Sequence, residues 1–573
     1  MEATLDTVTA RPNTHAILGV TNNDDSSACL IINGKIIAAV QEERFSRIKG
    51  HKGWPHKSIE HVLKAANLSI HEVTDLAYGW SAGFNPELHL NLYTERLREV
   101  DSNDTVTWNC INERIHNEIK NDKGARTEFV DFATTSGFSG STHMLDHHET
   151  HALGAYICSG FDDALVVTCD GRGDFQSLTV TDYTQLNAQV LQRETSTDSL
   201  GYFYGRITKL LGYLPNRHEG KVTGLAAKGN PETCMPLMQK MIGLENGRLR
   251  ANCGPWFQPY YDEFSEELRL EVAKYRPEDI AAAAQKHLED LITAIVSNHI
   301  EVDRPRNVCL AGGVFGNVKL NQRIRELPGV NTVYVLPCMG DGGLALAAAV
   351  AASAKKYRLS PNLDTMALGP DHDDTDMIGG ELSRDGLNVY GANIQDEMID
   401  LIGQSKIIGV VRGAMEYGPR ALCKRSIIFH ARDKTINDWL NKRLNRTEFM
   451  PFAPITPENL AHLCYNQWSV DDRAAHSMTM TYDCTDLMKE MCPAVVHVDG
   501  TARPQIISEK ADPFLYELLN KWFQLTGEPS LINTSYNRHE EPIINTPQEA
   551  ATTVHDGIVE ALFINDQLVV KRK

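Results

Sequence analysis

The feature that most constrains the fold is a pattern that occurs twice in this chain: an apolar run, a polar turn and a second apolar run. The first copy spans 16–32, with the polar segment 21–27 in its middle. The second spans 164–182 and turns after Asp170-Gly171. Short apolar runs bounded by turn residues are typical of buried β-strands. The chain therefore predicts two strand–turn–strand units whose polar tips are of the phosphate-binding type.

This repetition is the pattern of the actin-like ATPase fold, in which two such hairpins face one nucleotide. Asn33-Gly34 between apolar runs predicts a further tight hairpin. The weakly patterned segment 85–135 predicts a mainly helical insertion, and 278–302 predicts a long amphipathic helix. A linker at 357–375, rich in Pro, Asp and His, is the best domain boundary.

We therefore expect an α/β protein with three parts. These are a disordered lead at 1–14, an N-terminal actin-like (ASKHA) duplicated domain at 15–360 and a C-terminal α/β domain at 361–573. A chain of 573 residues is long enough for two or three domains.

Charge and composition narrow the class of protein. The net charge of −19 disfavours nucleic acid as a partner, because phosphate backbones require a basic face. The twelve cysteines are scattered without a CxxC pair, which indicates neither a zinc knuckle nor a disulfide framework. The polar N-terminus lacks a signal-peptide core, and no segment has the length of a membrane span. We expect a cytoplasmic protein with no membrane partner.

A histidine-rich segment carries the first candidate site. In His147-His148-Glu149-Thr150-His151, a helix would place His147 and His151 on one face. Asp170 closes the apolar run that follows, and Asp341 opens an Asp-Gly-Gly turn after another strand. Two imidazoles and a carboxylate favour a metal with open coordination positions. A surface helix with three histidines, and an ordinary Asp-Gly turn, are the alternatives.

Glycine-rich segments provide candidate phosphate contacts. Gly312-Gly313 lies between a strand and a helix, where backbone N–H groups approach phosphate closely, and Asn317 could read a ribose or base. The segment 219–229 could cradle phosphate through its backbone and Lys221, although it lacks the closing Lys-Ser or Lys-Thr of a P-loop. A glycine-capped helix is an equally good interpretation of that segment.

Basic residues recur in the C-terminal part of an otherwise acidic chain. Guanidinium groups match carboxylate and phosphate oxygens bidentately. Arg420 and Arg503 lie in short segments between apolar runs, where a solvated charged face is a poor explanation. The strand 531–537 runs into a hydroxyl- and amide-rich turn suited to holding a small polar group. The wider basic set is Arg412, Arg420, Lys424, Arg425, Lys442, Arg443, Arg446 and Arg503.

With these residues in place, the chain resembles the ATP-dependent O-carbamoyltransferases of antibiotic and toxin biosynthesis and of nodulation. The matching motifs occur in order over nearly the whole chain. They are HHxxH…VxxxDG (147–171), GKVTGLAAKG (220–229), LAGGVxxN (310–317), DGG (341–343), GxMEYGPRALxxRS (413–426), EFMPFAP (448–454) and INTSYNxxxEPI (532–543).

The resemblance implies a metal- and nucleotide-binding actin-like domain followed by a YrdC-like domain. The YrdC-like domain would form carbamoyl adenylate from carbamoyl phosphate and ATP, and the actin-like domain would transfer the carbamoyl group to an acceptor hydroxyl. The implied metal ligands are His147, His151, Asp170 and Asp341. The implied catalytic residues are Arg420, Arg425, Arg503 and Ser535. Substrate or cofactor contacts are expected from Lys221, Gly312, Gly313, Asn317, Arg446, Asn533 and Asn537.

Two departures from the family pattern bear on the chemistry. The family commonly carries His-Asp at the first hairpin, where this chain has Asp24-Asp25, so Asp24 becomes the candidate base for the acceptor hydroxyl if burial or its neighbour raises its pKa. Some relatives carry a Lys before PFAP, where Arg446 stands here.

The sequence and the resemblance also indicate which cofactors and partners to expect. The expected cofactors are ATP, a divalent metal with iron foremost and manganese or zinc as alternatives, and Mg²⁺ accompanying ATP. The expected partners are carbamoyl phosphate, a hydroxylated small-molecule acceptor that the sequence does not identify, and a second copy in a homodimer. The competing functions are a threonylcarbamoyl-type enzyme acting on tRNA, which the net charge disfavours, and a non-catalytic actin-like nucleotide-binding regulator.

Overall fold

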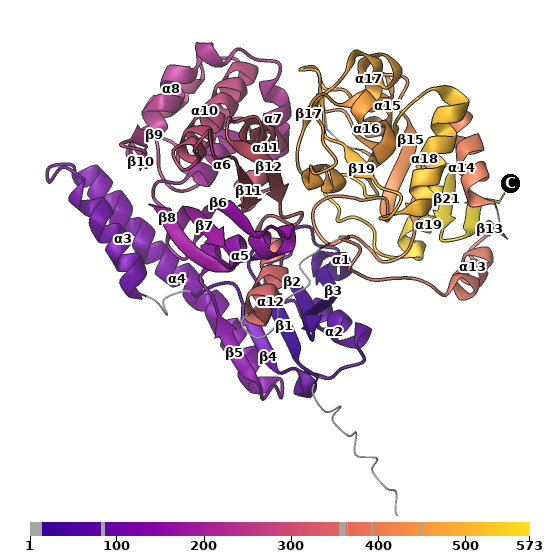
Figure 1. The fold of residues 1–573 in the computed structure, drawn as a ribbon, viewed down its shortest axis with the longest axis horizontal. Coiled ribbons are helices and arrows are strands. Elements are labelled where there is room, and N and C mark those ends of the chain that lie inside the picture. The colour runs from indigo at the N-terminus through magenta and orange to yellow at the C-terminus, as the bar shows by residue number, and fades with distance from the viewer. Residues whose placement is uncertain are drawn as a thin grey trace, which may run out of the picture.

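Two five-stranded sheets with the same topology form the N-terminal part of the molecule (Figure 1). The computed structural model describes residues 14–81, 86–354, 363, 365–391, 393–445 and 450–572. In the first sheet the strand order is β3-β2-β1-β4-β5, with β1, β2 and β3 antiparallel and β4 and β5 parallel to β1. The strands are β1 (Ala16–Thr21), β2 (Ser27–Ile32), β3 (Lys35–Gln41), β4 (Asp75–Tyr78) and β5 (Ser141–Met144).

The second sheet repeats this arrangement in the order β8-β7-β6-β11-β12, with the same strand directions. Its strands are β6 (Asp163–Gly173), β7 (Gln176–Thr184), β8 (Asn187–Thr195), β11 (Arg306–Ala311) and β12 (Val330–Val335). The hairpins β1–β2 and β6–β7 occupy equivalent places in the two sheets. The predicted α/β class and the repeated hairpin are therefore confirmed.

Two helices pack between the sheets and bring them close together. Helix α12 (Leu344–Ala354) contacts β1 and β2, and α5 (His147–Ser159) contacts β6 and β11. Small residues permit the close approach: a Cβ at Gly19 would lie 2.0 Å from the carbonyl oxygen of Ala345, and one at Gly154 would lie 2.5 Å from the Ala347 Cβ. The alanine-rich sequence of α12 thus matches its fully buried position.

The predicted turn at Asn33-Gly34 is confirmed. Asn33 and Gly34 have φ values of 49° and 79°, as a type I′ hairpin turn requires. The predicted helical insertion is confirmed as α3 (Pro86–Arg98) and α4 (Thr105–Thr135), and the long amphipathic helix as α10 (Pro277–Ser297). Asp104 caps α4 by accepting a hydrogen bond from the Thr107 amide.

The remaining N-terminal elements flank the two sheets. They are α1 (Glu43–Ser46), α2 (His56–Ala65), α6 (Leu200–Leu210), α7 (Glu219–Ala226), α8 (Met235–Met241), β9 (Ile242–Glu245), β10 (Arg248–Ala251), α9 (Glu266–Val272), α11 (Val318–Arg325) and four short 3₁₀ helices, η1 (Ile70–Glu72), η2 (Pro231–Thr233), η3 (Gly313–Gly316) and η4 (Asp341–Gly343).

The C-terminal part contains a mixed eight-stranded sheet in the order β13-β22-β21-β14-β15-β20-β16-β19. Its strands are β13 (Leu387–Gly391), β14 (Ile408–Val411), β15 (Arg425–His430), β16 (Ala453–Pro457), β19 (Gln505–Ile507), β20 (Leu531–Ser535), β21 (Ala561–Ile564) and β22 (Gln567–Lys571). The helices of this part are α13 (Thr375–Arg384), α14 (Ile394–Gly403), α15 (Ile436–Arg443), α16 (Glu458–Cys464), α17 (Asp486–Met491), α18 (Pro513–Thr526) and α19 (Pro547–His555). A separate ribbon pairs β17 (Tyr482–Asp483) with β18 (Thr501–Ala502).

The C-terminal part is fastened to the first sheet by buried polar contacts. The Tyr417 hydroxyl donates to the carbonyl oxygen of Gly342 and lies 3.2 Å from the Ser27 hydroxyl. Arg44 donates to the carbonyl oxygen of Gly418 over 2.8 Å. Arg47 donates to two carbonyl oxygens of the 542–543 segment.

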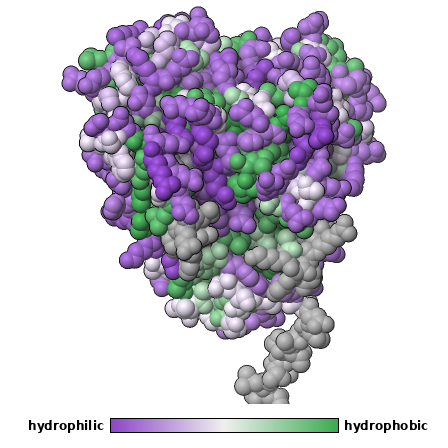
Figure 2. All heavy atoms as spheres, turned by 60° about the vertical axis from the view of Figure 1, so that its left-hand side comes forward, coloured by the Kyte–Doolittle hydropathy of each residue, from purple (hydrophilic) through white to green (hydrophobic). Residues whose placement is uncertain are grey.

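The predicted domain boundary at 360/361 lies outside the described residues, as does the predicted disordered lead except for Thr14. The cysteines are all buried and free. Among the described helices, none is long and apolar enough to cross a bilayer. Figure 2 shows a face that is mainly hydrophilic, with apolar residues in small groups.

Candidate functional site

Four side chains from three elements converge where the two sheets meet. His147 and His151 lie one turn apart in the first turns of α5, Asp170 lies near the end of β6, and Asp341 opens η4. One ligand atom from each of the four lies within 4.8 Å of all the others. The Asp170 Oδ2 atom is 3.3 Å from His151 Nε2 and 3.6 Å from His147 Nε2. The structure thus brings together the residues that the sequence predicted as metal ligands.

The electrostatics of this cluster favour a cation. Burial lowers the pKa of His147 and of His151, so both imidazoles are neutral and keep a lone pair. Burial raises the pKa of Asp170, and burial together with the charge of Asp170 raises that of Asp341. A buried and a half-buried carboxylate that repel each other are stabilised by a positive charge placed between them.

The hydrogen bonding of the cluster also fits a metal. Within the described residues, Nε2 of both histidines and Oδ2 of Asp170 are buried without a hydrogen-bond partner. Buried polar atoms are rarely left unpaired, and a metal ion uses the lone pairs of such atoms. Ligand atoms 3.3–3.9 Å apart suit a shared ion, because two ligands at about 2.1 Å each can lie about 4 Å from one another.

The predicted glycine pair supports this cluster. The Gly313 amide donates to Asp170 Oδ1 over 2.6 Å, and the Gly312 amide donates to the carbonyl oxygen of Met339 over 2.7 Å. Both amides therefore bond within the protein, and Gly313 orients a candidate metal ligand instead of presenting its N–H group to phosphate. Asn317 caps α11 and donates to Gln285, so its side chain also has a structural role.

Replacing Gly312 by Ala should destabilise the protein and disturb the cluster. Gly312 has a φ of 101°, and an added Cβ would lie 2.3 Å from the carbonyl oxygen of Cys169 and 2.8 Å from Asp170 Oδ2. We expect a loss of about 1–3 kcal/mol of unfolding free energy in urea denaturation. Gly316→Ala is the control, because a Cβ at Gly316 meets no atom within 4 Å. Equal stability of the two variants would contradict this account.

The first hairpin places two carboxyl groups near the cluster, and they differ in environment. Asp24, the predicted base, forms an ion pair with Lys52 and accepts a 3.4 Å hydrogen bond from Asn216. Burial, reinforced by the charges of Glu43, Asp24 and Asp341, raises the pKa of Asp25 to about 7. Asp25 therefore joins the predicted Asp24 as a candidate base.

The pKa of Asp25 predicts a pH-dependent stability. An aspartate with a folded pKa of about 7 binds more protons when folded than when unfolded between about pH 4 and pH 7, so its contribution to stability falls as pH rises through that window. Asp25→Asn removes the half-buried charge and should raise the melting temperature more at pH 8 than at pH 5. An equal change at both pH values, measured by scanning calorimetry, would contradict the assignment.

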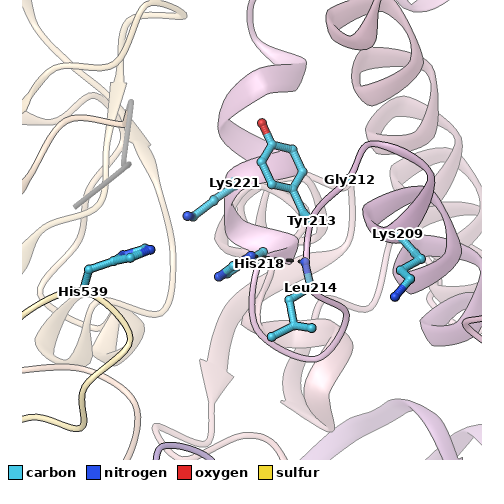
Figure 3. Close-up of a pocket in the computed structure, with 7 residues that line it drawn as sticks. All are labelled: Lys209, Gly212, Tyr213, Leu214, His218, Lys221 and His539. Atoms are coloured by element: carbon cyan, nitrogen blue, oxygen red, sulfur yellow. Dashed lines mark hydrogen bonds between the residues drawn. The ribbon is translucent and has the colours of Figure 1, made fainter. Parts of the chain in front are cut away.

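The predicted phosphate loop at 219–229 is in fact a helix at its start, since residues Glu219–Ala226 form α7. Its Lys221 lines a cavity of about 380 Å³ between the N-terminal and C-terminal parts. Figure 3 shows Lys221 and His539 extending toward each other from opposite sides, with Tyr213 and His218 beside them. Lys221 is thus placed to meet an anion through its side chain and not through a glycine-rich backbone.

The C-terminal basic residues separate into paired and unpaired groups. Arg412 and Lys424 both pair with Asp512. Within the described residues, Arg420 and Arg503 have no carboxylate partner. Burial lowers the pKa of Arg420 to about 10, and burial together with the neighbouring charge of Arg420 lowers the pKa of Arg503. Two half-buried guanidinium groups that repel each other form a candidate anion site.

Arg425 has a different environment. It is fully buried and donates four hydrogen bonds to the carbonyl oxygens of Pro370, Gly413, Lys424 and Asn545. Its guanidinium group joins backbone segments, which suits a positioning role, and its predicted catalytic role stays a prediction.

The predicted polar turn after β20 lies beside these segments. Asn533 donates to Gln505 and to the carbonyl oxygen of Ala421, next to Arg420, and Ser535 pairs with Ser426 in the sheet register. Asn537 donates to the carbonyl oxygens of Arg538 and Glu541. Arg446 lies outside the described residues.

Two residues near the cluster were missed from the sequence, Asp25 and Arg172. Asp25 was visible only as the second member of an Asp-Asp pair. Arg172 lies between two glycines at the end of β6, and its neighbours come from the insertion helix α4, which no local pattern links to that strand.

The comparisons with known proteins agree with the duplicated N-terminal part and the separate C-terminal sheet. A Carbamoyltransferase N-terminus model matches residues 16–350, and a Carbamoyltransferase C-terminus model matches residues 399–571. The molecule is therefore a transferase enzyme. The chain belongs to the carbamoyltransferase family.

Individual relatives include nodulation proteins. Nodulation protein NolNO of Sinorhizobium fredii is 30% identical over 96% of this chain and 79% of its own length. Nodulation protein NolO of Bradyrhizobium diazoefficiens is 30% identical over 75% of this chain and 79% of its own length. A crystal structure of full-length HypF in the phosphate- and nucleotide-bound form aligns at 14% identity with 62% of this chain and 58% of its own length, with a TM-score of 0.32.

Proposed function

We propose that this protein is an ATP-dependent O-carbamoyltransferase that works in two steps at two adjacent sites. The observation that carries the proposal is the turn η3, which touches both candidate centres. Its Gly313 amide holds Asp170 of the cluster, and its Gly316 carbonyl oxygen lies 3.4 Å from the Arg420 guanidinium. An anion-binding centre and a metal-type centre that share one turn suit the formation of an intermediate and its use.

In the first step, carbamoyl phosphate, ATP and water yield carbamoyl adenylate, phosphate and pyrophosphate in the C-terminal part, which we propose to be YrdC-like. Both substrates are anions, so their approach needs fixed positive charge. Arg420 and Arg503 supply that charge, and arginine does not lose its proton at neutral pH. Asn533 and Arg425 position the segment that carries Arg420.

In the second step, the carbamoyl group moves to an acceptor hydroxyl in the N-terminal part, which we propose to be actin-like. His147, His151, Asp170 and Asp341 would hold a divalent ion, with iron foremost. When bound, that ion would offset the negative charge of the departing AMP phosphate. The Asp25 carboxylate accepts the proton of the acceptor hydroxyl.

The partners follow from this chemistry. We propose carbamoyl phosphate as donor and a hydroxylated small molecule as acceptor, with ATP accompanied by Mg²⁺. The insertion 85–135, whose helix α4 contacts the tip of the β6–β7 hairpin, is where we expect contacts to the acceptor. A homodimer and a cytoplasmic location remain predictions.

The test is pyrophosphate release from ATP. We expect release only when carbamoyl phosphate is present, because the adenylate forms from both substrates. Pyrophosphate release that does not depend on carbamoyl phosphate, or none with both substrates present, would contradict the adenylate mechanism. Mass spectrometry of candidate alcohols incubated with the full system then detects the added carbamoyl group.

A further inference from the structure

Arg172 packs against Trp80, whose ring contacts the proposed metal ligand His147, and it has no role in the proposed mechanism. The next residue, Gly173, approaches His147 so closely that an added Cβ would lie 2.0 Å from the imidazole ring. The Arg172 guanidinium lies 5.3 Å from the ring centroid of Trp80. The Trp80 ring in turn lies 4.2 Å from the ring of His147. Arg172 therefore flanks one of the proposed ligands.

The insertion helix α4 holds Arg172 in this position. Arg172 Nη1 donates to Asp122 over 2.6 Å and lies 4.0 Å from a carboxylate oxygen of Glu118. Glu118 and Asp122 are one helical turn apart in α4, and both are buried. The Glu118 carboxylate also accepts the Phe175 amide at the tip of the same hairpin. Buried carboxylates are costly, so this arrangement indicates a required position for the guanidinium.

Only part of the Arg172 guanidinium is used by these contacts. Its side chain is 20% exposed, and within the described ranges no acceptor takes the hydrogens of Nε and Nη2. That edge of the guanidinium matches two oxygens of a phosphate group. A phosphate group placed between Arg172 and a bound divalent ion would be attracted by positive charge on both sides.

We infer that Arg172 contacts substrate in the transfer site, where its Nε–Nη2 edge binds the phosphate group of carbamoyl adenylate and of the AMP that leaves. Asp122 and Glu118 of the insertion helix are its positioning residues. This inference rests on the proposed function, because it assumes that an adenylate reaches the cluster.

AMP and adenosine binding to the full-length, metal-loaded protein tests the inference by calorimetry. All proteins carry Arg503→Met, so that the C-terminal arginine pair does not contribute to AMP binding. Arg172→Met combined with Asp122→Asn removes both charges together and leaves no unpaired aspartate. We expect AMP affinity to fall at least tenfold and adenosine affinity to stay unchanged. Arg172→Lys keeps the charge without the fork and should give an intermediate AMP affinity.

The matched control is Arg306→Met. Arg306 pairs with Asp182 at the other end of the β6–β7 hairpin, with a similar exposure of 25%. This control should bind AMP as its parent does. Unchanged AMP affinity in the folded double variant would overturn the inference, and so would equal losses for AMP and adenosine, since those indicate a structural role. Failure of the proposed function is seen separately, as absent carbamoyl phosphate-dependent pyrophosphate release in the unmodified protein.

Discussion

Replacing His151 by Ala should abolish carbamoyl transfer and leave adenylate formation intact. His151 is fully buried, and its Nε2 atom is 3.3 Å from Asp170 and 3.9 Å from Asp341, so it is central to the cluster. Residues that only support a metal ligand contribute roughly 10–100-fold to affinity or activity, and we expect at least that loss from removing a ligand. Metal content by elemental analysis, product formation and pyrophosphate release are measured on the same preparation.

His287→Ala is the control for the loss of a buried histidine. His287 lies in α10, is 5% exposed and has its Nε2 atom 2.7 Å from the carbonyl oxygen of Ile242, and no predicted site includes it. It should lower the melting temperature but keep both metal and transfer. If His151→Ala reduced pyrophosphate release as strongly as transfer, the division of the reaction between two sites would be wrong.

Replacing Arg503 by Met should have the opposite outcome, with adenylate formation lost and the protein no less stable. Removing one preorganised charge from an anion site costs roughly 10²–10³ in rate. Because Arg420 already disfavours the charged form of Arg503, deleting that charge relieves repulsion. We expect pyrophosphate release to fall by that factor, with an unchanged or higher melting temperature and unchanged metal content.

Arg325→Met is the control variant, because it removes an arginine with a structural ion pair. Arg325 forms a 3.0 Å ion pair with Asp472, which is buried, so removing the arginine leaves that carboxylate uncompensated. It should lower the melting temperature and keep pyrophosphate release. A drop in stability for Arg503→Met that matches the drop for Arg325→Met would show that Arg503 is a structural residue and not part of an anion site.

The parts of the fold that were predictable are those set by local pattern. The Asn33-Gly34 turn was readable because few residues adopt positive φ at two successive positions. The histidine spacing in 147–151 was readable because one helical turn brings positions four apart to the same face. The partners Asp170 and Asp341 follow strands, where functional side chains commonly occur in α/β folds.

The rest depends on which distant segments meet. The sequence of 219–229 is compatible with both a phosphate loop and a helix. In the structure its first part is helix α7, which packs against α10 and α6. Arg425 and Arg420 lie in the same motif, yet one donates to four carbonyl oxygens and the other has no acidic partner among the described residues. The sequence cannot separate them, because the acceptors of Arg425 come from residues 370, 413 and 545 as well as its neighbour.

The hydroxyl of Tyr417 has a consequence for the intermediate. It donates a hydrogen bond to the carbonyl oxygen of Gly342, the residue after Asp341. Tyr417 itself precedes Arg420 by three residues. A mixed anhydride such as carbamoyl adenylate decomposes in water, so the time it spends between the two centres limits the yield. The hydrogen bond of Tyr417 links the segment that carries Arg420 to the turn that carries Asp341, and so fixes the distance that the intermediate travels. Removing this hydrogen bond, as in Tyr417→Phe, should therefore increase the amount of pyrophosphate released for each carbamate ester made.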